Sequence, residues 1–157
     1  MTSQFLNKIY SIYDKLKNIS LDNENPVTDT EFHSMGNLTL GVEIELQLID
    51  SLNYNLSPKA EIVLELASEI AKIKPEFYLS MVEINTDKCK DVHEVNTDLS
   101  KSFMLIKEIT KKLNLQLSTT GSHPFAKYAD CIISPTKRYL ELIDRNQWLT
   151  KRMTVYG

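Results

Sequence analysis

Two acidic residues, Glu43 and Glu45, stand two positions apart in an alternating polar and apolar segment that runs from Leu40 to Asp50. Such alternation is typical of a β-strand, so both carboxylates and Gln47 are expected on one face, with Leu46 and its apolar neighbours facing a core. Two carboxylates about 6 to 7 Å apart on one face repel each other. The spacing therefore predicts a cation between them, and a solvated strand face is the alternative.

A second strand-like segment, residues 77–86, carries one more carboxylate. Glu83 follows a run of strand formers and shares a face with Asn85. A glutamate on an otherwise apolar strand face is costly unless it is paired or bound to a metal ion. Glutamates on two strands suit Mg²⁺, which prefers oxygen ligands and shares its shell with water and substrate phosphates. The spacing alone also permits a solvated acidic face.

Four further residues are candidates for binding or catalysis. Asn85 and Thr86 end the second strand and are expected to bind the nucleotide or substrate, with turn formation as the alternative. His123, in a turn before a proline, is expected to contact substrate or phosphate, and a structural hydrogen-bonding role is the alternative. Arg152 is our preferred arginine for a substrate carboxylate or phosphate, because its guanidinium binds such groups in a bidentate manner.

Helices and strands are expected to alternate along the chain and to position these residues. Ser57 and Pro58 are expected to begin one helix, and Asp91 and Glu94 form a capping-box pattern at the start of another. The expected order is a helix over 5–16, a flexible polar loop over 18–36, a strand over 40–50, a helix over 58–73, a strand over 77–86, a helix over 92–113, a strand over 115–119, a helix from Ser134 to about Trp148 and a strand over 150–157.

Length and composition limit the class of protein. A chain of 157 residues with 42% hydrophobic and 25% charged residues is expected to form a single domain over 1–157. The net charge of -3 and the lack of a basic stripe argue against a nucleic-acid partner. No apolar run approaches the roughly 20 residues that cross a bilayer, so no membrane partner is expected. Cys89 and Cys131 form no paired motif, which fits a reducing, cytoplasmic location.

The final segment, residues 150–157, reads as a strand whose neighbour is not accounted for. We therefore expect the 157 residues to be part of a longer protein. An unpaired strand edge also invites self-association, so a homodimer is expected.

Several segments together resemble the carboxylate-amine ligase branch of the glutamate-cysteine ligases, glutamate-cysteine ligase family 2. The resemblance covers about residue 38 to the end and departs from many relatives at Ile44 and Leu46, where a further acidic residue and an aromatic are common. The segments that carry it are Gly41–Leu46, Met81–Thr86, Gly121–Phe125, Arg145–Trp148 and Arg152–Gly157.

The resemblance implies an α+β fold, in which an antiparallel β-sheet with flanking helices curves around a metal cluster as in glutamine synthetase. It implies an ATP-dependent ligase that joins glutamate or a similar acid to cysteine or another amine through an acyl phosphate, a step of glutathione-type biosynthesis. Glu43, Glu45 and Glu83 would bind Mg²⁺. A histidine motif and further ligands are expected beyond Gly157, so residues 1–157 are expected to be the N-terminal part of a longer ligase catalytic domain and to be inactive alone. A metal-dependent hydrolase and a non-catalytic binding module are the alternatives.

Overall fold

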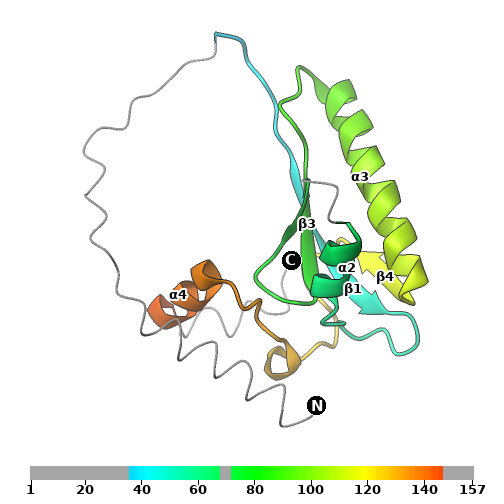
Figure 1. The fold of residues 1–157 in the computed structure, drawn as a ribbon, viewed down its shortest axis with the longest axis vertical. Coiled ribbons are helices and arrows are strands. Elements are labelled where there is room, and N and C mark those ends of the chain that lie inside the picture. The colour runs from blue at the N-terminus through cyan, green and yellow to red at the C-terminus, as the bar shows by residue number, and fades with distance from the viewer. Residues whose placement is uncertain (1–35, 68–71, 147–157) are drawn as a thin grey trace.

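The computed structural model describes residues 36–67 and 72–146, and this part of the chain is built around one antiparallel sheet (Figure 1). The strands lie in the order β2-β3-β1-β4. This confirms the α+β class with an antiparallel sheet, while the glutamine-synthetase-like arrangement stays a prediction. The elements are β1 (Glu43–Asp50), α2 (Ala60–Leu66), β2 (Ile73–Pro75), β3 (Met81–Asn85), α3 (Val92–Lys112), β4 (Leu115–Ser118), a short 3₁₀ helix (Tyr128–Asp130) and α4 (Lys137–Arg145).

Three expected elements fall outside the described residues. They are the helix over 5–16, the loop over 18–36 apart from Gly36 itself, and the strand over 150–157 with Arg152. Their predictions, and those of a single domain and a homodimer, stay predictions.

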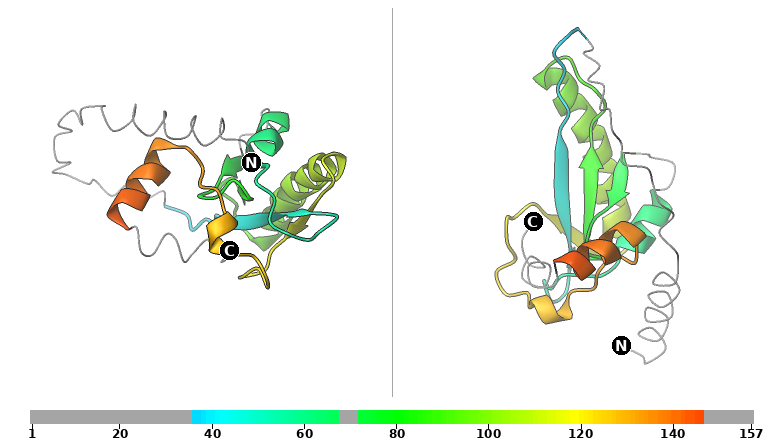
Figure 2. Two further views of the ribbon diagram at one scale, coloured as in Figure 1. Left: turned by 90° about the horizontal axis from the view of Figure 1, so that it is seen from below. Right: turned by 90° about the vertical axis from the view of Figure 1, so that its left-hand side faces the viewer.

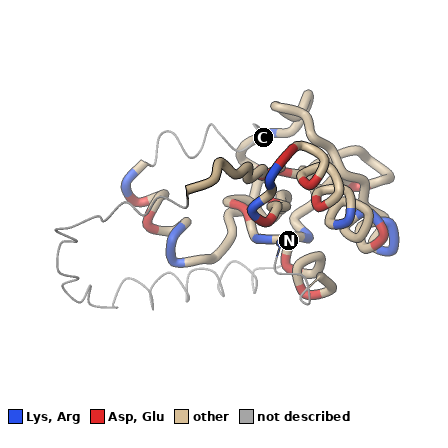
Figure 3. The backbone as a smooth tube through the Cα atoms, turned by 90° about the horizontal axis from the view of Figure 1, so that it is seen from above, with Lys and Arg blue, Asp and Glu red and all other residues tan. Residues whose placement is uncertain are grey.

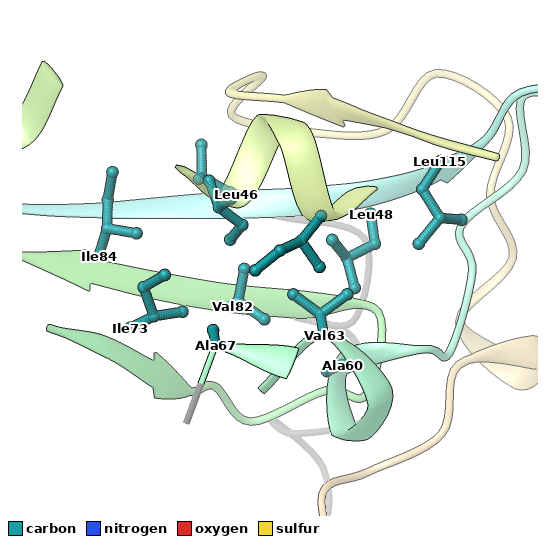
Figure 4. Close-up of a cluster of buried hydrophobic side chains, with 11 residues drawn as sticks. Leu46, Leu48, Ala60, Val63, Ala67, Ile73, Val82, Ile84 and Leu115 are labelled. Atoms are coloured by element: carbon teal, nitrogen blue, oxygen red, sulfur yellow. The ribbon is translucent and has the colours of Figure 1, made fainter. Parts of the chain in front are cut away.

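Helices α2 and α3 cover one face of the sheet, and α4 lies on the opposite side (Figures 1 and 2). The face toward α2 and α3 is apolar because alternate residues of β1 and β3 point to it. These strand residues pack with side chains from both helices into one core (Figure 4). Its buried members are Leu46, Leu48, Ala60, Val63, Ala67, Ile73, Val82, Ile84, Ile106, Ile109 and Leu115.

Helix α3 is fixed at its N-terminus by side chains that bind exposed backbone N–H groups. Asp91 Oδ1 accepts hydrogen bonds from His93 N at 2.9 Å and Glu94 N at 3.0 Å, which satisfies donors that have no partner inside the helix. Glu94 reaches back to Lys90 N at 2.8 Å rather than to the cap residue. The predicted helix and its Asp91 cap are confirmed, with the reciprocal bond displaced by one residue.

The second expected helix begins later and ends earlier than predicted. Ser57 does not cap it, because Ser57 N donates to Leu48 O at 2.8 Å and the residue continues the pairing of β1. The helix begins at Ala60, and Lys59 is its cap residue. Ile73 is not helical but pairs with Ile84 in β2. This strand lies at the sheet edge, where Pro75 can be tolerated although it has no N–H to donate.

The strand over 77–86 is split, and the helix predicted from Ser134 is shortened, for one shared reason. The chain near Phe77 and Leu79 pairs with residues 132–134: Leu79 N donates to Ile132 O and Ser134 N donates to Phe77 O, both at 2.8 Å. Extended pairing at Ser134 keeps this residue out of the helix, which begins at Lys137 instead. Regular β3 then begins only at Met81.

Charge of both signs is interleaved along the described backbone, most visibly on α3 (Figure 3). At the start of α3, Lys90 Nζ lies 2.7 Å from Glu94 Oε1, four residues further along the chain. Within the described ranges, no helix has the length and apolar character required to cross a membrane.

We expect truncation of the core to destabilise the fold strongly. Ile106 in α3 is fully buried, so Ile106→Ala should lower the free energy of unfolding by about 2 to 5 kcal/mol through lost burial and a cavity. Ile62 in α2 is 46% exposed, and Ile62→Ala is the matched helical control, with an expected change below about 1 kcal/mol. Chemical denaturation measures both; equal losses would contradict the assigned core.

Candidate acidic site on the sheet

The pairing of β1 with β3 brings the three predicted metal ligands to one face of the sheet. In the antiparallel register, Glu45 lies opposite Glu83, and Glu43 lies opposite Asn85. Residues directly opposite in such a pair have Cβ atoms about 4.5 to 5.5 Å apart. Carboxylates about 40 residues apart in the sequence therefore become neighbours on adjacent strands. The face that carries them is opposite to the face that forms the core in Figure 4.

The carboxylates of this face are accessible to solvent and ligands. Glu43 and Glu45 are exposed, and Glu83 is partly buried. Lys74 lies opposite Glu83 on β2, yet in the described part of the chain no ion pair joins a lysine or arginine to any of the three. The cation expected between them is thus not a described protein side chain.

The carboxylate oxygens of this face are the type of ligand that a divalent cation prefers, but the carboxylates alone do not surround a single binding position. Among the described residues, no three His, Cys, Asp or Glu side chains converge as a metal-binding group. Magnesium commonly takes only one or two carboxylates and completes its shell with water and phosphate oxygens. Binding of Mg²⁺ by Glu43, Glu45 and Glu83 therefore stays a prediction.

Asn85 is held against the acidic pair by a side-chain hydrogen bond. Its Nδ2 donates to Glu43 Oε1 at 3.0 Å, whereas its Oδ1 is buried and has no hydrogen-bond partner among the described residues. Thr86, the next residue, uses its hydroxyl to accept a hydrogen bond from Val42 N at 3.0 Å. Thr86 thus holds β1 to the end of β3, and its predicted contact with a nucleotide stays a prediction.

The face continues toward β4 through polar side chains, of which Gln47 is buried. Gln47 is only 2% exposed, and its Oε1 accepts a hydrogen bond from Thr120 Oγ1 at 3.2 Å. Thr120 Oγ1 also lies 3.1 Å from Ser118 Oγ. A buried amide is stable only when it is hydrogen-bonded, so the Thr120 hydroxyl helps to hold Gln47 on the same face as the carboxylates.

Glu76 is a fourth carboxylate of this site that sequence reasoning missed. Burial raises the pKa of Glu76, and the negative charges of Glu45 and Glu83 raise it further, whereas the hydrogen bond from Phe77 N and the charge of Arg138 lower it. Phe77 N donates to Glu76 Oε1 at 2.7 Å. The only sequence signal was a charged residue between Pro75 and an aromatic run, and proximity to Glu45 arises from strand pairing alone.

Helix α4 closes one side of the acidic face. Tyr139 donates its hydroxyl to Pro75 O at 3.1 Å, and its ring meets Phe77 edge-on with 5.3 Å between centroids. Burial raises the pKa of Tyr139, and the nearby charge of Glu76 adds to the shift. The guanidinium of Arg138 lies 5.9 Å from the Tyr139 ring centroid, so α4 brings a phenol and a cation toward the carboxylates.

His123 is buried and bound to main chain on both sides of its ring. Its Nδ1 accepts from Ala126 N at 3.0 Å, so the proton belongs on Nε2, which lies 3.0 Å from Tyr54 O and donates to it. These contacts match the structural role that was the alternative to catalysis. Arg152, the other predicted catalytic residue, lies outside the described residues.

Comparison with known proteins identifies the family of this chain. The sequence model of glutamate-cysteine ligase family 2 matches residues 39–157, which include all the described site residues. The chain belongs to glutamate-cysteine ligase family 2. This confirms the family resemblance, and the paired strands β1 and β3 lie within the residues that the family's sequence model matches.

Relatives in glutamate-cysteine ligase family 2 cover most of this chain. A protein of Bdellovibrio bacteriovorus named "Putative glutamate--cysteine ligase 2" is 40% identical over 120 residues, which are 76% of this chain and 32% of that protein. A protein of Gloeobacter violaceus with the same name is 35% identical over 130 residues, which are 80% of this chain and 35% of that protein. The chain thus spans 32% to 35% of the length of these family members.

We expect His123→Ala to weaken the fold of this family member. The substitution leaves Tyr54 O and Ala126 N without their partner, and the expected loss is about 1 to 3 kcal/mol in the free energy of unfolding. His93→Ala, at an exposed position of α3, is the control and should cost less. Unchanged stability of His123→Ala in chemical denaturation would contradict the structural role.

We expect Glu76 to make stability depend on pH. Its raised folded pKa means that the folded protein holds this proton more tightly than the unfolded chain, so stability falls as pH rises from below the ordinary value of 4.5 through the folded pKa. Glu76→Gln keeps an acceptor for Phe77 N but does not ionise, so it should unfold at a higher temperature than the wild type at pH 7 and show a smaller loss between pH 4 and pH 7.

The control for this pH dependence is Glu61→Gln, an exposed position of α2. It should reproduce the wild-type difference in melting temperature between the two pH values. If Glu76→Gln shows the same difference in melting temperature between pH 4 and pH 7 as the wild type, Glu76 is not the source of the pH dependence.

Proposed function

We propose that this chain supplies the acidic half of the active site of an ATP-dependent carboxylate-amine ligase of the glutamate-cysteine ligase type. One observation carries the proposal: the register that sets Glu45 opposite Glu83 and Glu43 opposite Asn85 on a solvent-accessible face. Family membership supplies the class of reaction. The substrates are glutamate or a similar acid, ATP, and cysteine or another amine.

The proposed reaction has two balanced steps. The side-chain carboxylate of the acid substrate attacks the γ-phosphorus of ATP, the bond to the β,γ-bridging oxygen breaks, and ADP leaves with that electron pair. The amine nitrogen then attacks the acyl carbon, inorganic phosphate leaves, and the nitrogen loses a proton as the amide forms. The first step needs the attacking and leaving oxygen atoms to be held in line, and both steps need the reactants to be positioned and negative charge to be neutralised.

Glu43, Glu45 and Glu83 would hold the Mg²⁺ ions of this reaction. When bound, magnesium neutralises charge on the phosphate oxygens and orients ATP. The protein contributes fixed carboxylates, because all three belong to paired strands whose opposite face is the buried core. Strand-borne ligands lose little freedom when the cation binds, since the backbone that carries them is already ordered.

The other side of the face is formed by the β2–β3 connection, which carries Glu76, and by α4, which carries Arg138 and Tyr139. Arg138 would place a positive charge at the edge of the carboxylates, where an acidic substrate or a phosphate would be attracted. Partial burial of Glu76 and Tyr139 lowers water access on this side. An acyl phosphate hydrolyses in water, so exclusion of water favours transfer to the amine.

We expect removal of one strand carboxylate to lower turnover strongly. ADP release is measured on the intact protein with Mg-ATP and glutamate across a panel of amines, beside Glu45→Gln. Loss of a cation ligand should lower kcat by about 10² or more. Glu61→Gln on α2, on the opposite side of the sheet, is the matched control and should keep wild-type turnover.

The dependence on amine separates this proposal from other functions. ADP release that requires one amine and forms an amide product supports the ligase. ADP release that is independent of amine, and that Glu45→Gln abolishes, would assign a metal-dependent hydrolase instead. If neither the wild type nor Glu45→Gln releases ADP with any acid and amine, the result would indicate a non-catalytic binding module.

A further inference from the structure

The hydrogen bond to Glu43 determines how the side-chain amide of Asn85 is oriented. The NH₂ group is the donor of the amide, and Asn85 Nδ2 donates to Glu43 Oε1 at 3.0 Å. Oδ1 therefore occupies the other branch of the amide. This oxygen is buried, the residue is only 8% exposed, and no donor in the described structure reaches it.

An unpaired buried amide oxygen costs about 1 to 3 kcal/mol, so its retention beside the acidic face needs a reason. The register surrounds Asn85 with acceptors: Glu43 lies opposite it and Glu83 stands two positions earlier on the same strand face. Its own main-chain N–H is occupied, since Asn85 N donates to Lys72 O at 2.9 Å. A site made of acceptors on the same face is suited to a cation.

We propose that Asn85 Oδ1 is a neutral oxygen ligand of the divalent cation held by Glu43 and its neighbouring carboxylates. This inference rests on the proposed function and adds a ligand to it. Since no three described carboxylates converge on one point, a cation there needs further oxygen atoms, and Asn85 supplies the buried one. Amide carbonyl oxygens are ordinary ligands of hard divalent cations.

A neutral ligand at this position also limits repulsion within the site. A carboxylate in place of Asn85 would stand directly opposite Glu43, whereas the amide donates a hydrogen bond to it. Asn85 thus orients one carboxylate through Nδ2 and coordinates through Oδ1. The two functions belong to different atoms, so substitutions can separate them.

The experiment measures Mn²⁺ binding to the intact protein by electron paramagnetic resonance, without ATP or turnover. Asn85→Leu removes both atoms and should weaken Mn²⁺ binding about tenfold or more. Asn85→Asp keeps an oxygen and adds charge, so it should bind Mn²⁺ at least as tightly as the wild type. Asn96→Leu and Asn96→Asp, at an exposed position of α3, are the matched controls and should leave binding unchanged.

Three results would overturn the inference. Equal weakening in Asn85→Leu and Asn85→Asp would show that Asn85 acts only by orienting Glu43, because both variants lose the Nδ2 donor. Unchanged Mn²⁺ affinity in Asn85→Leu would assign the oxygen to another ligand, such as the ammonium group of the amine substrate. Absence of Mn²⁺ binding by the wild type would remove the cation altogether.

Binding and turnover report on different proposals. Mn²⁺ binding that depends on Asn85, in a protein with no amine-dependent ADP release, would support the ligand and refute the ligase. Circular dichroism of each variant shows whether it is folded, and Asn85→Asp tests the inference independently if Asn85→Leu does not fold.

Discussion

The antiparallel register between β1 and β3 is the constraint on which the rest of the described structure depends. A shift by one residue would turn every side chain of β1 to the other face, exposing Leu46 and burying Glu45. Burial of Leu46 with Val82 and Ile84 in the core makes such a shift costly. The same apolar packing that stabilises the fold therefore also sets which carboxylates meet on the opposite face.

Hydrogen bonds outside the regular ladder hold this register at both ends. Near the start of β1, Val42 and Thr86 exchange two hydrogen bonds, one through the Thr86 hydroxyl and one between main-chain atoms. Beyond them, Leu40 and Cys89 form a further antiparallel bridge. At the other end, Leu48 N donates to Ser80 O at 2.8 Å. Glu43 and Glu45 thus lie on a segment whose backbone is fixed on either side.

The distribution of cations separates a structural region from the acidic face. Lys72 binds Asp98 and, at 2.7 Å, Asp87, and these contacts lower the pKa of Asp98 and raise that of Lys72. This cluster ties α3 to the start of β2. Glu45 and Glu83 receive no such partner among the described residues.

The sequence by itself determined the local elements and the chemical types on each face. Strand alternation placed Glu43 and Glu45 together, and the Asp91 cap and the apolar spacing of α3 predicted that helix, because these signals act between residues close in the chain. Only the tertiary structure decided that Glu76 joins the carboxylates, that Ile73 is a strand residue and that both nitrogens of His123 bind main chain. Each of these depends on strand pairing or loop packing between distant segments, and such contacts leave no periodic pattern in the sequence.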